Sequence, residues 1–512
     1  MRTSSTRRAA LALSAALVAC GGGGSGGGTT PPTTGDLHVT VGGLPAGVDA
    51  DVNVAGPGGY TGHLTTTGTL SGLAPGSYLV TAALVSTGGQ SYAADVTGGT
   101  PATVVAGEIA NVTVDYTLSG TAPTVTAVTP ASADYTAAGR SVAIAGTDFV
   151  AGATVSFDGT PGTAVNVYSS TFLTVNAPAI ATGFHDVTVT TPGGTSATGP
   201  GNRIHCWHFT PYDITANGGQ GGMTFGPDGN VWFTERSTGK VGKVTPAGVV
   251  TEYTLPSPDA NPVDPVDIAV GADGNLWVSD YVHAQVVRVT PTGTGTDFAL
   301  PSGCQSFGIT SGPGSTVWFT ELGCPGPSGS PNKIGSIDTA STSTIVEREL
   351  AGAFPLTFGM ALGSDGNLWF AEYDNYKLSR ITSGGTVTKF PSGSAMTYST
   401  PTWMTAGPDG NLWFNESKLG VVTTAGDLTE HAVIGYAGGL VSGRITHDDA
   451  LIWYSASSSI GSMDTATFAN EDFPVAPTGY LPSGIAVDGN GVVWVLVQSP
   501  ATSAAKVLRF DH

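Results

Sequence analysis

FGPDGNVWFTE, residues 225–235, recurs with small changes at 270–280 (VGADGNLWVSD), 362–372 (LGSDGNLWFAE) and 406–416 (AGPDGNLWFNE). In each copy a Gly-rich turn with an Asp-Gly pair precedes a short apolar run that contains one Trp. Asp-Gly is a strong signal for a tight hairpin, because Gly accepts a positive φ without strain. The stretch therefore predicts a β-hairpin that the fold uses repeatedly.

The recurring Trp gives the period of the repeat. It falls at residues 232, 277, 318, 369, 413, 453 and 494, at intervals of 45, 41, 51, 44, 40 and 41 residues. Two further strands follow each hairpin, as at 240–246 and 249–255 in the first copy. Four antiparallel strands in about 40–45 residues is the period of a propeller blade. We therefore predict a seven-bladed β-propeller over residues 203–512, with each Trp packed between blades.

The ends of the repeat region suggest how the ring closes. The seventh copy stops after its third strand near residues 506–511, and the segment CWHFTPYDI (206–214) precedes the first copy as an isolated strand. We expect 206–214 to supply the missing fourth strand of the seventh blade, because closure across the termini removes the free sheet edges.

The N-terminal part contains further short strands with period-two alternation and Gly/Pro turns. Residues 37–118 predict a small β-sandwich that resembles carboxypeptidase-regulatory-like or PEGA-type modules. Residues 120–202 resemble an IPT/TIG domain, an immunoglobulin-like sandwich, through PTVTAVTPASADYTAAGRSVAIAGTDF, ATVSFDGT and GFHDVTVTTPGGTS. The fold class is therefore all-β: a seven-bladed propeller preceded by two sandwiches.

The first 36 residues predict export and a tether. Arg2, Arg7 and Arg8 precede a short apolar run that ends in LVAC at residues 17–20. This resembles the signal peptide of a bacterial lipoprotein, in which Cys20 is lipidated and anchors the protein in the membrane. Gly21 after the Cys is not the Asp that retains lipoproteins at the inner membrane, so the resemblance favours the outer membrane. Residues 21–36, rich in Gly, Pro and Thr, read as a linker.

The composition excludes one class of partner. The net charge is −20, and between residues 9 and 202 the only Lys or Arg is Arg140. A nucleic-acid binder needs a basic face to displace counterions from phosphate, so we expect no nucleic-acid partner. We expect a monomer whose partner is a small molecule, a glycan or a protein.

The motif GPDGNLWF-x-E, with a third strand of the form K-[VIL]-G-x-[VI], resembles the virginiamycin B lyase (streptogramin lyase) family over roughly 203–512. The resemblance implies a metal-assisted elimination that opens a cyclic depsipeptide ester, with a catalytic His fourteen residues before the repeated acid. In this chain none of those positions is His: they are Gly221, Val266, Phe307, Phe358, Thr402, Ser483 and, in the sixth copy, about Ser442. A general base must lie next to the proton that it removes, so the change argues against that activity.

An acid follows the repeated Trp by three residues in five copies. By topology we expect these acids near the mouth of the central channel, where a carboxylate ring would suit Mg²⁺ or Ca²⁺, although no cofactor is certain. The alternative is that each acid satisfies hydrogen bonds between blades. The five acids are Glu235, Asp280, Glu321, Glu372 and Glu416.

Cys304 and Cys324 lie at mirror positions about Gly314 in the hairpin of the third copy. Mirror positions face each other across an antiparallel ladder, and an exported protein meets an oxidising compartment. We therefore expect a Cys304–Cys324 disulfide.

Two functions remain open from the sequence. One is a non-catalytic, membrane-anchored lipoprotein whose acidic propeller binds a ligand or a protein partner. The other is a lyase of the virginiamycin B type that uses a different residue as the base.

Overall fold

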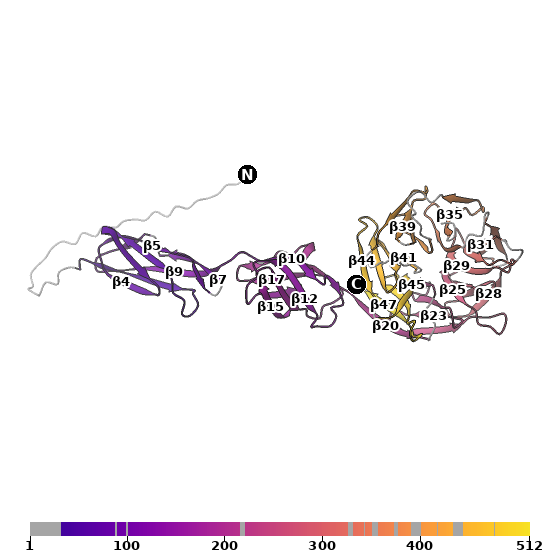
Figure 1. Ribbon diagram of the computed structural model, residues 1–512, viewed down its shortest axis with the longest axis horizontal. Coiled ribbons are helices and arrows are strands. Elements are labelled where there is room, and N and C mark those ends of the chain that lie inside the picture. Colours follow the sequence, from indigo (N-terminus) through magenta and orange to yellow (C-terminus); the bar gives the residue numbers. More distant parts are fainter. Residues whose placement is uncertain are drawn as a thin grey trace, which may run out of the picture. The chain divides into compact units, whose positions relative to one another are not determined.

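The computed structural model describes residues 32–512 except 88–89, 99–100, 216–220, 326–330, 342–343, 351–356, 373–376, 391–400, 417, 434–443 and 476. The described chain is built of β-strands with two short 3-10 turns, which confirms the predicted all-β class (Figure 1). Within these residues no helix has the length and apolar character to cross a membrane. The predicted signal peptide, its Cys20 and most of the linker lie outside the described residues.

The chain divides into two compact units. The first contains the N-terminal sandwich together with the segments 147–153 and 190–196. The second contains the segments 125–146, 154–189 and 197–512, and therefore joins most of the second sandwich to the propeller.

The N-terminal sandwich has two sheets whose inward residues alternate with exposed ones, as in β1, where Leu37 and Val39 are fully buried. The first sheet has the order β4 (Gly68–Leu73), β1 (Gly35–Gly42), β9 (Ile109–Ser119), β7 (Gln90–Thr97) and β6 (Val85–Thr87). The second has the order β3 (Tyr60–Leu64), β2 (Val52–Gly56), β5 (Gly76–Ala82) and β8 (Ala102–Val104).

The second sandwich also has two sheets. One has the order β10 (Thr124–Thr129), β12 (Ser141–Thr147), β16 (Phe172–Asn176) and β15 (Thr163–Ser169). The other has the order β11 (Ser132–Ala133), β19 (Arg203–Cys206), β17 (Gly183–Thr191), β13 (Thr154–Phe157) and β14 (Thr160–Pro161), with β18 (Gly194–Thr195) on β17. Because β19 pairs with β17 and β11, the propeller begins at His208 rather than at residue 203.

Seven four-stranded antiparallel sheets follow, which we number as blades one to seven (Figure 1). Blade one is β21 (Met223–Phe225), β22 (Val231–Glu235), β23 (Lys240–Val244) and β24 (Val250–Thr254); blade two is β25 (Pro265–Val270), β26 (Leu276–Asp280), β27 (Gln285–Val289) and β28 (Gly295–Ala299). Blade three is β29 (Gln305–Ser311), β30 (Thr316–Leu322), β31 (Lys333–Asp338) and β32 (Ile345–Glu349); blade four is β33 (Thr357–Leu362), β34 (Leu368–Glu372), β35 (Lys377–Ile381) and β36 (Val387–Phe390).

The last three blades complete the ring. Blade five is β37 (Met404–Ala406), β38 (Leu412–Asn415), β39 (Leu419–Val422) and β40 (Leu428–His431); blade six is β41 (Ile445–His447), β42 (Leu451–Ser455), β43 (Ser459–Asp464) and β44 (Asn470–Pro474). Blade seven is β45 (Leu481–Val487), β46 (Val493–Gln498), β47 (Ala505–Asp511) and β20 (His208–Ile214). The first strands of consecutive blades lie side by side, and β21 contacts both β25 and β45.

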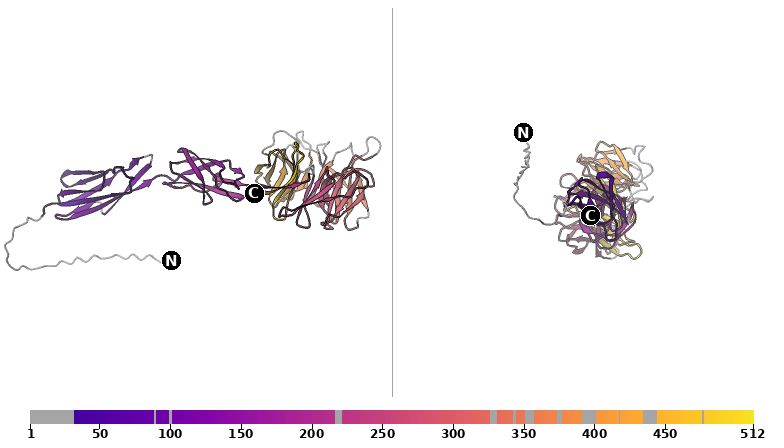
Figure 2. Two further views of the ribbon diagram at one scale, coloured as in Figure 1. Left: turned by 90° about the horizontal axis from the view of Figure 1, so that it is seen from below. Right: turned by 90° about the vertical axis from the view of Figure 1, so that its left-hand side faces the viewer.

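The predicted closure across the termini is confirmed. β20 pairs antiparallel with β47 from His208–Asp511 to Ile214–Ala505. Phe209 and Phe510 pack against each other inside this seam, with ring centroids 4.7 Å apart and the rings tilted by 35°, and both are buried. Figure 2 shows the C-terminus next to the point where the chain enters the propeller. An early strand and the last strand thus form one sheet, in which β20 covers the edge that β47 would otherwise expose.

The recurring positions of the repeated motif have structural roles within and between the blades. All seven Trp side chains are buried between blades, at 2% exposure or less. In blade one the indole Nε1 of Trp232 donates a hydrogen bond to Asp228 at 2.9 Å, and Asp228 also accepts from the backbone N–H of Asn230. Gly229 between them has a φ of +76°, which favours Gly. Equivalent bonds join Trp277 to Asp273, Trp369 to Asp365 and Trp413 to Asp409. The repeat thus builds blades, not a reactive centre.

Candidate functional site

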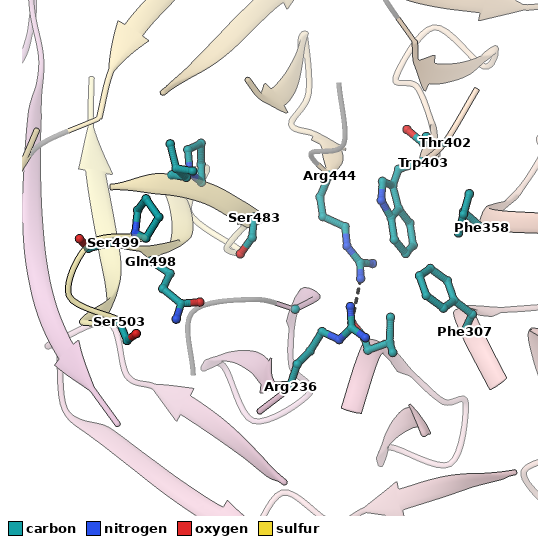
Figure 3. Close-up of a pocket in the computed structure, with 15 residues that line it drawn as sticks. Arg236, Phe307, Phe358, Thr402, Trp403, Arg444, Ser483, Gln498, Ser499 and Ser503 are labelled. Carbon is teal, nitrogen blue, oxygen red and sulfur yellow. Dashed lines mark hydrogen bonds between the residues drawn. The ribbon is translucent and has the colours of Figure 1, made fainter. Parts of the chain in front are cut away.

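A cavity of about 690 Å³ opens on the axis of the propeller, where the first strands of the blades begin (Figure 3). Its size falls in the usual range for small-molecule sites, about 300–1,000 Å³. The lining residues are Gly221, Arg236, Val266, Phe307, Phe358, Thr402, Trp403, Arg444, Leu481, Pro482, Ser483, Gln498, Ser499, Pro500 and Ser503.

Six of these residues occupy the positions at which the lyase resemblance places a catalytic His. They are Gly221, Val266, Phe307, Phe358, Thr402 and Ser483, each within two residues of the start of a first strand. The six positions thus line the central cavity, but the residues there have no group that titrates near neutral pH. In blade six the backbone N–H of Ser455 donates to the carbonyl oxygen of Arg444, as that of Thr234 donates to Gly222 in blade one, so Arg444 corresponds to Gly222. The seventh position is therefore residue 443, one after the predicted Ser442, and both lie outside the described residues.

The next residue along each first strand forms a tight inner ring. The backbone N–H groups of Gly222, Asp267 and Gly308 each donate to a Thr or Ser hydroxyl on the second strand of the same blade. At Gly308 an added Cβ would lie 1.9 Å from the carbonyl oxygen of Phe358, so no larger residue fits there. Three blades depart from Gly at this ring position, with Asp267, Trp403 and Arg444.

These three departures meet one another. The guanidinium of Arg444 donates through Nη1 to the Asp267 carboxylate and through Nη2 to the carbonyl oxygen of Val266, at 2.9 Å for the second bond. The guanidinium carbon also lies 3.4 Å from the centroid of the Trp403 ring, as expected for a cation–π contact. Arg444 is thus fixed between blades two and five.

A second guanidinium faces the same space. Arg236 directly follows β22 and forms a bidentate pair with Asp264, through Nε at 3.0 Å and Nη2 at 2.6 Å. Figure 3 shows Arg236 and Arg444 pointing toward each other across the cavity. Burial lowers the pKa of Arg444; the Asp267 carboxylate opposes that shift, and the charge of Arg236 adds to it. The two cations are therefore close enough to repel.

Aromatic rings form the wall next to these cations. Phe307 and Trp403 stack with centroids 6.0 Å apart, and Phe358 meets Phe307 edge to face at 5.0 Å. Across the cavity, blade seven contributes hydrogen-bonding side chains, among them Ser483, Gln498 and Ser503 (Figure 3). One wall is aromatic, and the other presents these polar groups beside Leu481, Pro482 and Pro500, a combination that suits an amphipathic ligand.

The five repeated acids lie elsewhere, and the prediction that they line the channel mouth is wrong. Glu235, Asp280, Glu321 and Glu372 are fully buried and Glu416 is 1% exposed, and none of them belongs to the lining given above. Each acid is one of the last two residues of the second strand of its blade or directly follows that strand, so the first strand lies between the acid and the axis.

Most of these acids have partners inside the blades or at the joints between them, as the alternative reading expected. Asp280 accepts from the backbone N–H of Asp264 and Val282 and from Gln285 Nε2, and it lies 2.9 Å from His283 Nδ1. Glu372 accepts from Ser379 and, at 3.3 Å, from Lys389. These contacts are structural.

Two of the acids have pKa values raised to neutral pH or above, so they are partly or largely protonated there. Burial, with the neighbouring carboxylate of Glu252, raises the pKa of Glu235 to about 8. Burial, with the carboxylate of Glu347, raises the pKa of Glu321 to about 7. Neither group then supplies the full negative charge that attracts a hard cation.

The cavity does not fit the divalent cation that the lyase resemblance implies. Hard cations take carboxylate and carbonyl oxygens, whereas the charged residues of this lining are Arg236 and Arg444. Among the described residues, one cluster has a metal-like spacing: Cys304, Glu321 and Cys324. Its two sulfur atoms are bonded to each other, with Cα atoms 4.1 Å apart, so they are not thiolate ligands. Cys206 is free and buried.

Arg236, Trp403 and Arg444 were not predicted as site residues from the sequence. A signal was available in the aligned repeats: the position after the expected catalytic His is Gly222, Gly308, Gly359 and Gly484 in four blades. The three departures from Gly are an acid, an aromatic residue and a base. Only the ring geometry shows that these three residues converge.

Comparisons with known proteins agree with this architecture. A model of the virginiamycin B lyase family matches residues 208–503, and an IPT/TIG domain model matches residues 123–203. A solved streptogramin B lyase is 26% identical, with a TM-score of 0.51, over 59% of this chain and 97% of that chain. A catalytically inactive histidine-to-alanine variant of virginiamycin B lyase from Staphylococcus aureus with quinupristin is 27% identical, with a TM-score of 0.52, over 60% and 99%. No curated protein matches.

Proposed function

Since this chain belongs to the virginiamycin B lyase family, we propose that its propeller keeps the central binding cavity of the fold and uses it to bind a ligand without lyase catalysis. The protein that carries the propeller is an exported lipoprotein in this proposal. The two sandwiches then act as spacers between the membrane anchor and the cavity.

The observation that supports a binding role is the chemistry of the cavity lining. Proton abstraction next to an ester needs a base with a pKa near the working pH. The six described positions where the resemblance placed that base are Gly, Val, Phe, Phe, Thr and Ser, and all six face the cavity. The loss of a histidine makes the Staphylococcus aureus relative inactive. Removal of a positioned acid–base group typically slows a reaction about 10²–10⁴-fold.

The cavity nevertheless has the features of a binding site. It is of small-molecule size, it combines an aromatic wall with a polar wall, and two arginines are held in place by aspartates behind them. Side chains fixed before a ligand arrives reduce the ordering cost of binding.

A binding screen tests this role. The full mature chain is screened against a fragment library by ligand-observed NMR, and each hit is repeated with Gln498→Trp, which places a large ring in the cavity. Val249→Trp, at a 60% exposed position, is the matched control. Hits that are lost only in Gln498→Trp support the proposal; a library whose hits all survive that substitution contradicts it.

The anchoring part of the proposal rests on residues 1–21 and has its own test. Expression with an alkyne-bearing fatty acid should label the wild-type chain and not Cys20→Ser, and the wild type should fractionate with the outer membrane. A wild-type chain that takes up no label is not a lipoprotein.

A further inference from the structure

We propose that the cavity binds an organic anion, with the acidic group held between Arg236 and Arg444 and an aromatic or other apolar body packed on Phe307 and Phe358. The proposal deepens the binding role above and rests on it.

Positive charge is concentrated at the cavity. The chain has only 18 Lys and Arg residues against 38 Asp and Glu, yet both charged residues of the cavity lining are arginines. Two like charges that face each other in a partly desolvated space are unfavourable, and an anion placed between them relieves the repulsion. In an acidic protein this arrangement favours a negatively charged ligand.

The guanidinium of Arg236 has N–H donors available to a ligand. Arg236 uses Nε and Nη2 on Asp264, and among the described residues Nη1 has no hydrogen-bond partner. Its side chain is 31% exposed, so these N–H groups are accessible from the cavity. A guanidinium presents several donors in one plane, which matches a carboxylate or phosphate group.

Two aspartates hold the guanidinium groups in place from outside the cavity lining. Asp267 is 6% exposed and already accepts from the backbone N–H of Ile309 at 3.1 Å as well as from Arg444. Asp264 lies behind Arg236, and neither aspartate belongs to the lining given above. The aspartates therefore orient the two guanidinium groups, while the surfaces that a ligand would meet are cationic.

An aromatic surface lies next to the two guanidinium groups. Phe307 and Phe358 are partly exposed and both line the cavity. They meet edge to face, which leaves ring surface for a planar group. The face of Trp403 is covered by Arg444. A ligand that reaches both arginines therefore has its apolar body over the two phenylalanines.

The test compares anions with uncharged analogues that have the same ring system. Isothermal titration calorimetry of the full mature chain compares indole-3-acetate with its neutral analogue tryptophol, and phenyl phosphate with phenol. We expect the anion of at least one pair to bind at least ~10-fold more tightly than its neutral partner, because charge-assisted hydrogen bonds are stronger than neutral ones. The pair that shows the difference identifies carboxylate or phosphate as the preferred group.

Two matched variants locate the effect. Arg236→Gln should remove most of the preference for the anion, and Arg236→Lys should keep part of it. Arg288→Gln changes the net charge equally at an arginine that packs on Phe298 away from the cavity, and should have no effect. Equal binding of anion and neutral analogue, or equal effects of Arg236→Gln and Arg288→Gln, overturns the anion proposal and leaves the binding role intact. If the fragment screen also gives no hit that Gln498→Trp removes, both proposals fail.

Discussion

The guanidinium carbon of Arg444 lies 3.4 Å from the centre of the Trp403 ring, and the same guanidinium donates to the buried carboxylate of Asp267. Arg444 and Trp403 directly precede the first strands of blades six and five, and Asp267 lies in the first strand of blade two. One side chain thus connects three blades across the axis of the ring, and it does so at the edge of the cavity.

Arg444→Met should therefore destabilise the propeller. The substitution leaves Asp267 buried without its cation, and breaking a buried pair in this way typically costs about 3–5 kcal/mol. Urea unfolding followed by Trp fluorescence measures the change. The double variant Arg444→Met/Asp267→Asn should lose clearly less than the sum of the two single variants. Strict additivity would show that the pair is not coupled.

Ring closure through β20 and β47 gives a second prediction. Phe510 is fully buried and contacts the rings of Phe209, Trp207 and Phe473. Phe510→Ala should lower the free energy of unfolding by about 3–5 kcal/mol, because it leaves a cavity in the seam. Phe172→Ala, at a 41% exposed position, is the control. A loss below ~1 kcal/mol for Phe510→Ala would mean that the seam contributes little to stability.

The raised pKa of Glu235 predicts a specific pH dependence. An unfolded Glu titrates near pH ~4.3, whereas the folded-state pKa is about 8. The folded state then holds the proton more tightly, so stability is highest below the unfolded pKa and falls as the pH rises through about 8. Denaturant midpoints between pH 5 and pH 9 should therefore fall less steeply for Glu235→Gln than for the wild type. The exposed Glu349→Gln should follow the wild type; a Glu235→Gln slope equal to it would contradict this account.

Divalent cations should have little effect on the fold. The repeated acids are buried, raised pKa values leave Glu235 and Glu321 partly or largely protonated near neutral pH, and the cavity presents arginines. We expect the same melting temperature in EDTA, in millimolar Mg²⁺ and in millimolar Ca²⁺. A concentration-dependent increase with either ion would show that the folded state binds it, since preferential binding raises stability by mass action.

The architecture was predictable from the sequence because its signals are local. The Asp-Gly turn, the buried Trp and the alternation of apolar residues act within one hairpin, and their spacing counts the blades. Ring closure was predictable from the same count, because the seventh copy of the repeat had only three strands and residues 208–214 formed an isolated strand.

The site was less predictable because it depends on contacts between blades. The repeat marks Glu235 and its four counterparts strongly, but the repeated element is the one that builds the blade, and the first strand separates these acids from the axis. Arg236, Trp403 and Arg444 are exceptions to the repeat. Their importance comes from meeting residues 28 to 177 positions away, such as Asp264 and Asp267, which no local pattern shows.

The central claim is that this family member binds in its cavity without opening a depsipeptide ring. The most direct test incubates the full mature chain with quinupristin and Mg²⁺, next to an active streptogramin lyase. Because elimination gives an isomer of the substrate, liquid chromatography with tandem mass spectrometry must separate the two. The account predicts that quinupristin stays intact with this chain while the control enzyme consumes it. Turnover at a rate comparable to the control enzyme would contradict the account and establish the chain as a lyase with a different base.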